Sequence, residues 1–120
     1  MKITGILLTL AIMLAFQMPV KVQAFECPKH FKAAQAAIDK VMGDMGGEMS
    51  KMMKKEEVTL VHALLDDAKT LLSGAKHNHE KPQRIYDHAR AIAKADSARG
   101  YAVAADIYHW KLMGKMKKMK

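Results

Sequence analysis

Apolar residues recur every three or four positions through most of the chain, a spacing typical of amphipathic α-helices. The first stripe consists of Phe31, Ala34, Ile38, Val41 and Met45. Similar stripes run from Val58 to Leu72, from Ile85 to Ile92 and from Tyr101 to Leu112. No segment shows the alternating pattern of a half-buried strand, so the chain is expected to be all-α.

Proline and glycine indicate where the first two helices begin and end. Pro28 suits the first position of a helix, which would make Cys27 the capping residue. The pair Gly46-Gly47 should end that helix. A second helix is expected within residues 49–73, with Gly74 as the residue after its end.

The second half of the chain is expected to hold two further helices. The segment "AKHNHEK" after Gly74 is polar and reads as a loop. Pro82 opens a third helix, and Asp96 or Ser97 can cap a fourth. The prediction is an up-down-up-down four-helix bundle. The alternative is a helical hairpin with one long C-terminal helix, since no proline follows Pro82.

The first 24 residues have the features of a cleaved secretory signal peptide. Lys2 is followed by an apolar run from Ile3 to Phe16, and Val22-Gln23-Ala24 offers a cleavage site. That run is shorter than the ~20 residues that span a bilayer. Residues 25–120 would then form a single periplasmic domain with a basic, Met-rich tail from about Met113.

The charge of the chain favours acidic partners over nucleic acid for a protein outside the cytoplasm. The formal net charge is +8, and removal of Lys2 and Lys21 with the signal peptide leaves 8 − 2 = +6. A periplasmic partner protein is therefore one expectation. The C-terminal segment combines Trp110 and Leu112 with several lysines, which suggests weak contact with an anionic membrane surface.

Cysteine and histidine supply one set of candidate metal ligands. Cys27 and His30 lie three positions apart at the expected helix start, where the helix dipole favours a thiolate. His77 and His79 alternate in the expected loop, and His109 flanks the core face of the last helix. In the four-helix topology all five would meet at one end of the bundle, with His88 nearby. Cys27 is the single cysteine, so it is either free or joins two chains in a dimer.

Methionine supplies a second set. Outside the signal peptide, methionines occur in only two groups, which are Met42, Met45, Met49, Met52 and Met53, followed by Met113, Met116 and Met119. Thioethers are soft ligands that select Cu(I). The alternative is that flexible methionines serve as adaptable packing. The first group is taken as a candidate Cu(I) site.

The segment "IYHWK", Ile107 to Lys111, resembles the last helix of the small four-helix-bundle b-type cytochromes. That family holds haem between a methionine early in the first helix and a histidine late in the fourth. His109 matches the histidine, and His30 would have to replace the methionine. The resemblance implies non-covalent haem binding between His30 and His109.

Catalytic motifs are missing from the sequence, which has no nucleophile–base pattern and no glycine-rich phosphate loop. The chain is therefore expected to be a binding protein and not an enzyme. The expected function is to bind a soft or borderline metal, Cu(I) first, for storage, transfer or tolerance. The alternatives are a haem-binding bundle and a non-catalytic interaction or chaperone-like module.

Overall fold

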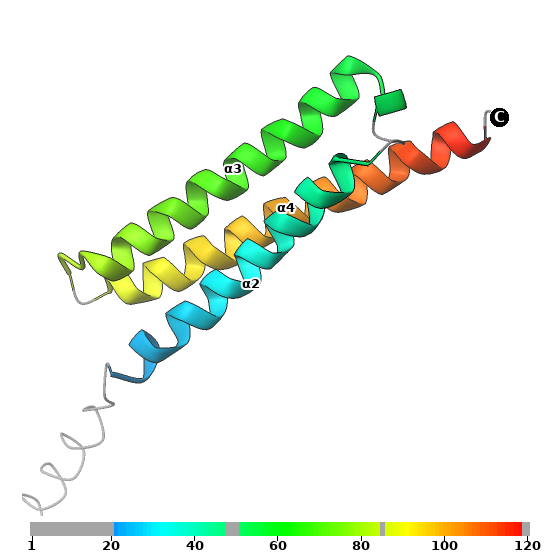
Figure 1. The fold of residues 1–120 in the computed structure, drawn as a ribbon. Helices are drawn as coiled ribbons and strands as arrows, with labels where there is room; N and C mark the ends of the chain where they lie inside the picture. The colour runs from blue at the N-terminus through cyan, green and yellow to red at the C-terminus, as the bar shows by residue number, and fades with distance from the viewer. Residues whose placement is uncertain (1–20, 48–50, 85, 119–120) are drawn as a thin grey trace, which may run out of the picture.

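The computed structural model describes residues 21–47, 51–84 and 86–118, which form three helices (Figure 1). These are α2 (Lys21–Met45), α3 (Lys55–Glu80) and α4 (Asp87–Lys118). No strand occurs in these three ranges. The predicted all-α class is confirmed. Side chains of residues 21–25 and of Met116 lie outside the description, as do Met49 and Met119 and most of the expected signal peptide.

The predicted four-helix bundle is wrong, because the two helices expected after Pro82 form the single 32-residue helix α4. Both candidate caps make other contacts. The Ser97 hydroxyl donates to the Ala93 carbonyl oxygen within the helix, at 2.9 Å. The Asp96 carboxylate lies 2.6 Å from His30 on another helix. The long C-terminal helix of the alternative prediction is therefore present, but α2 packs against it.

The boundaries of α2 and α3 also differ from the prediction in part. α2 ends at Met45, directly before Gly46-Gly47, as expected. It already includes Lys21, however, so Pro28 lies inside the helix and Cys27 is not its cap. α3 continues past Gly74 to Glu80, and the expected loop "AKHNHEK" is therefore mostly helical. The Lys81 N–H closes this helix by donating to the His77 carbonyl oxygen at 3.0 Å.

Helices α2 and α4 run parallel, and α3 runs antiparallel to both (Figure 1). Two side-chain contacts tie α2 to α4 in one register, the contact of His30 with Asp96 and the ion pair of Lys40 with Asp106. The starts of α2 and α4 and the end of α3 therefore share one end of the bundle. We call it the α4-start end, and the other the α4-end end.

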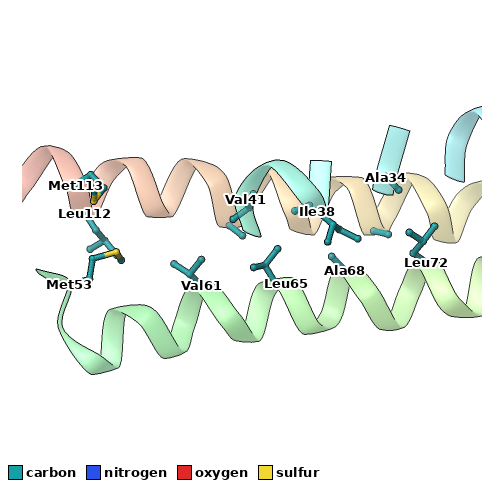
Figure 2. Packing of buried hydrophobic residues seen from close by; sticks show 13 residues of the cluster. Ala34, Ile38, Val41, Met53, Val61, Leu65, Ala68, Leu72, Leu112 and Met113 are labelled. Carbon is teal, nitrogen blue, oxygen red and sulfur yellow. The ribbon is translucent and has the colours of Figure 1, made fainter. Parts of the chain in front are cut away.

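The core is a seam of buried positions that are alternately three and four residues apart. On α3 these are Val61, Leu65, Ala68, Leu72 and Ala75. On α4 they are mostly alanine, which lets neighbouring helices approach closely, namely Ala91, Ala95, Ala98, Ala102 and Ala105. Ala34, Ile38 and Val41 of α2 complete the cluster (Figure 2). This spacing of 3.5 residues is that of coiled-coil packing.

The α4-end end of the seam is closed by sulfur-containing side chains. Met53, just before α3, is buried against the end of α4, where Leu112 and Met113 are also buried (Figure 2). The expected tail from residue 113 is therefore the last part of α4 as far as Lys118. None of the described helices combines the length and the apolar character that a membrane crossing requires.

Candidate metal centre

Cys27 occupies a core position near the start of α2. Its side chain has no exposed surface. It lies seven residues, two helical turns, before the buried Ala34, and therefore on the same face. The Cys27 thiol donates to the backbone carbonyl oxygen of His88 at 3.7 Å, which joins α2 to the first turn of α4.

Two histidines continue the seam at the same end. His79 follows the buried Ala75 by four residues on α3, and His88 precedes the buried Ala91 by three residues on α4. Both spacings keep the alternation of three and four that defines the core. At the α4-start end, the last seam position of each of the three helices is therefore a residue that can bind a metal.

The three side chains converge. The Cys27 Sγ atom and one ring nitrogen from each of His79 and His88 lie within 4.8 Å of one another. The two imidazole rings meet edge to face, with centroids 5.3 Å apart and planes at 69°. Ligands around one ion of this class are about 3.5 Å apart, given metal–ligand bonds of ~2.0–2.3 Å. Small rotations of the side chains would close the remaining gap.

The surroundings of the thiol favour its neutral form. Burial raises the pKa of Cys27, and the neighbouring Glu26 carboxylate raises it further, against a backbone hydrogen bond that lowers it. The helix-start position on which the expected activated thiolate rested is wrong, because Cys27 lies inside α2 and not at its first turn. A bound cation would reverse this balance, since a coordinating thiol loses its proton.

The two histidines of the cluster have buried ring nitrogens that favour a metal ion. The Nδ1 atoms of His79 and His88 are buried, and no described residue gives either of them a hydrogen-bond partner. A buried polar atom left in this state costs about 1–3 kcal/mol. The Phe31 ring packs edge to face on His79, with centroids 5.5 Å apart, and shelters this side of the site. The donor set and its unsatisfied nitrogens both fit a metal ion.

The other histidines predicted as ligands do not join this cluster. His30 is half-buried and bonded to Asp96. His77 is exposed and lines a polar cavity beside Lys81 and Arg90. His109 is buried on α4, 21 residues and thus about 32 Å beyond His88.

The predicted convergence is wrong for His109, because it required a break in α4, whereas Cys27, His30, His77 and His79 share the α4-start end. The haem pair is separated as well. Asp96, the partner of His30, lies 13 residues before His109, which is about 20 Å along the helix. One haem iron cannot bridge that separation, so the haem alternative gains no support.

The methionines of the first group have different surroundings. Met53 is only 8% exposed, whereas Met42 and Met52 are 48% and 51% exposed. Met42 and Met45 line one groove beside α3, and Met49 lies outside the described residues. Packing explains Met53, and the groove gives Met42 and Met45 a shared surface.

His88 is the ligand that the sequence prediction left out of its metal set. The signal was the alternation of three and four that leads from Ala98 back through Ala95 and Ala91 to His88. The stripe predicted from Ile85 to Ile92 instead places Ala89 on the core face, and Ala89 is exposed, while Ile85 lies outside the described residues. Because the predicted core face of this segment was out of phase, His88 was not identified as a ligand.

Comparison of the chain with protein-family models, with curated proteins and with solved structures found no match.

Proposed function

We propose that this protein binds one soft or borderline transition-metal ion, with Cu(I) preferred, at Cys27, His79 and His88. The observation that carries the proposal is the approach of one sulfur and two imidazole nitrogens, from three different helices, to within 4.8 Å of one another. Cys27 lies 79 − 27 = 52 residues from His79 and 88 − 27 = 61 residues from His88 in the sequence. Their meeting follows from the seam register of all three helices.

The donor set selects the class of metal. A thiolate with two neutral imidazoles suits Cu(I), copper(II) or zinc and does not suit Mg²⁺ or Ca²⁺, which prefer oxygen ligands. Two features favour Cu(I) over zinc. The protein supplies three ligands, not the four of a closed structural zinc site, and the methionine-rich composition points to soft-metal handling.

The proposed role is storage, transfer or tolerance in the periplasm, without a reaction of the protein's own. A three-ligand site leaves room for a ligand from a donor or acceptor to approach the ion, which exchange requires. The expected secretion signal would place the site outside the cytoplasm. Because Cys27 is fully buried, a disulfide-linked dimer would require this end to open, and metal binding is the better use of the thiol.

Metal binding should also clamp the bundle, since each ligand comes from a different helix. An ion that binds the folded chain alone, at 100 times its Kd, adds about 2.7 kcal/mol to the free energy of unfolding. The helix ends that carry the ligands would then be held together at the end of the bundle where α2 and α4 begin.

A competition titration tests the proposal. Reduced protein is titrated with Cu(I) in the presence of a chromophoric Cu(I) chelator, and the wild type should bind one equivalent tightly. The variants Cys27→Ala, His79→Gln and His88→Gln should each lose this tight binding, with an affinity about 100-fold lower. The matched controls His30→Gln and His77→Gln, at the same end of the bundle, should keep it. Equal affinity of ligand variants and controls would reject the site.

A further inference from the structure

A continuous groove runs between α2 and α3. It consists of three linked cavities of about 340, 190 and 430 Å³. Lys69 lines both the first and the second cavity, and Gln35 and Lys76 line both the second and the third. The groove therefore extends from Met45 to Phe31 along α2.

The floor of the groove is apolar. Met42, Met45 and Leu65 line the first cavity, Ile38 and Leu72 the second, and Phe31 the third. Ile38, Leu65 and Leu72 belong to the buried core, so the groove reaches down to the seam of the bundle. Met42 is nonetheless 48% exposed.

The arrangement of the helices explains why this side is open. α4 packs extensively against both α3 and α2, whereas α2 and α3 contact each other least. In a four-helix bundle, two helices that share a neighbour in this way lie at diagonal corners. The groove then coincides with the fourth corner, opposite α4, where the described residues supply no helix.

The rim of the groove carries mainly positive charge. Lys51 and Lys69 line the first cavity, Lys76 the second and third, and Lys32 the third, and all four are exposed. Asp39 is the one carboxylate among the lining residues of the three cavities. The Lys69 Nζ atom also lies 3.8 Å from the Asp66 Oδ1 atom. The Asp66 side chain is 74% exposed, and an ion pair this exposed contributes little to stability.

We propose that this groove docks an amphipathic α-helix of a partner protein that has an apolar stripe flanked by aspartate and glutamate. The distance from Phe31 to Met45 is 14 residues, about 21 Å, which matches four turns of a docked helix. Flexible methionines adapt to such a partner. A second copy of this face would set lysine against lysine, which disfavours self-association.

Docking of a helix in the groove does not require the metal centre, although the groove and the metal centre share Phe31. This side chain lines the third cavity and also packs on the His79 ring. A partner helix in the groove would therefore contact a residue that covers the metal ligands. Such a partner would be placed to receive or deliver the ion.

The test uses the full chain and a synthetic probe. The probe is a fluorescein-labelled 18-residue helical peptide with leucine on one face and glutamate on both flanks. Its control carries lysine in place of glutamate. The acidic peptide should bind at least about tenfold more tightly than the control, and 0.5 M NaCl should weaken it, since salt screens the charge contacts. Equal binding of the two peptides would overturn the proposal.

Site-specific readouts locate the complex. With ¹³C-methyl-labelled methionine, the peptide should shift the Met42 and Met45 signals and leave those of Met52 and Met113 in place. The double variant Lys69→Glu and Lys76→Glu should weaken the acidic peptide about tenfold or more. The control pair Lys111→Glu and Lys115→Glu on α4 should not, and thermal unfolding checks that both variants fold.

Three results would contradict a partner helix. If the double variant and its control bind the acidic peptide alike, the rim lysines do not recognise it. If anionic lipid vesicles shift the Met42 and Met45 signals and the peptide does not, the groove takes a lipid. If the same signals shift with protein concentration alone as a dimer forms, the occupant is a second copy.

Discussion

The two ends of the bundle use similar residues for different purposes. Where α4 begins, Cys27, His79 and His88 come from three helices and converge. Where α4 ends, His109 is buried close in sequence to Leu112 and Met113, which pack with Met53 in the apolar cluster. The His109 ring meets Trp110 edge to face, with centroids 5.8 Å apart.

The comparison shows that soft-ligand residue types do not by themselves identify a metal site. Each end has histidine at a seam position and a sulfur-containing residue among its buried side chains. At the α4-start end the neighbours are a thiol and a second imidazole, and the three ligand atoms lie within 4.8 Å of one another. At the α4-end end, methionine side chains fill space in the core as leucine would.

Loss of one metal ligand at the α4-start end should have the largest effect on Cu(I) binding. His88→Gln should lower Cu(I) affinity by about 100-fold, or roughly 2.8 kcal/mol, because one of three ligands is lost. His109→Gln should leave the affinity within about twofold and lower thermal stability instead. Competition titrations of both variants, beside melting curves, provide the measurement. A large loss of affinity in the His109 variant alone would exchange the roles of the two ends.

Replacement of the methionines should lower stability and leave Cu(I) binding at the Cys27 centre unchanged. Leucine at Met42, Met45, Met52 and Met53 removes four sulfurs and keeps apolar bulk, at a cost typically under ~1.5 kcal/mol per core position. The largest share should come from Met53, the buried one. Cu(I) binding at the Cys27 centre should remain. Chemical denaturation and titration of the variant measure both quantities, and a loss of the first equivalent of copper would restore the methionine site.

The chemistry of the thiol gives a third test. Because burial raises its pKa, Cys27 in the metal-free protein should be alkylated with a midpoint above the ordinary thiol value of ~8.5. The stability linked to this group is present below the unfolded pKa and is lost as pH rises through the folded pKa. Iodoacetamide rates from pH 6 to 11 provide the profile. A midpoint below the ordinary value would indicate the activated thiolate that the structure does not show.

The smallest effect concerns the turn that brings His79 and His88 together. The Asp87 carboxylate accepts hydrogen bonds from the backbone N–H groups of Gln83 and Arg84, at 2.7 and 2.8 Å. These bonds and the nearby arginines hold the pKa of Asp87 below its usual value. Its stabilising effect is therefore present above the unfolded pKa of ~3.9 and is lost as pH falls through the folded pKa.

The variant Asp87→Asn should lower the melting temperature at pH 7, and its difference from wild type should vanish in strong acid. The equivalent change Asp106→Asn, in the Lys40 pair between α2 and α4, provides a comparison away from the turn. If the Asp87 variant matched wild type at neutral pH, the turn would not depend on this carboxylate.

Local signals in the sequence predicted the helical class and the break at Gly46-Gly47, but not the number of helices. Gly74 is an ordinary signal for the end of a helix, and Asp96 and Ser97 are ordinary signals for the start of one. Helices α3 and α4 nevertheless continue through these positions. Buried residues on either side, such as Ala95 and Ala98, keep α4 on its neighbours. Tertiary packing overrides weak local preferences where the seam is unbroken.

The candidate site was predicted only in part for a related reason. Cys27 and His79 were chosen by residue type, and the structure brings them together. His88 could be found only from the phase of α4, which the local signals at Pro82 set wrongly. Its partners lie 61 and 9 residues away in the chain, so no short motif marks the set.

X-ray absorption at the copper edge of Cu(I)-loaded protein distinguishes the Cys27 centre from a methionine site. We expect one sulfur and two nitrogen neighbours in the wild type, and loss of the sulfur neighbour in Cys27→Ala. The spectrum of the variant with leucine at Met42, Met45, Met52 and Met53 should be identical to that of the wild type. A shell of several sulfurs that persists in Cys27→Ala and disappears in the leucine variant would instead assign the ion to the methionines and rule out the Cys27 centre.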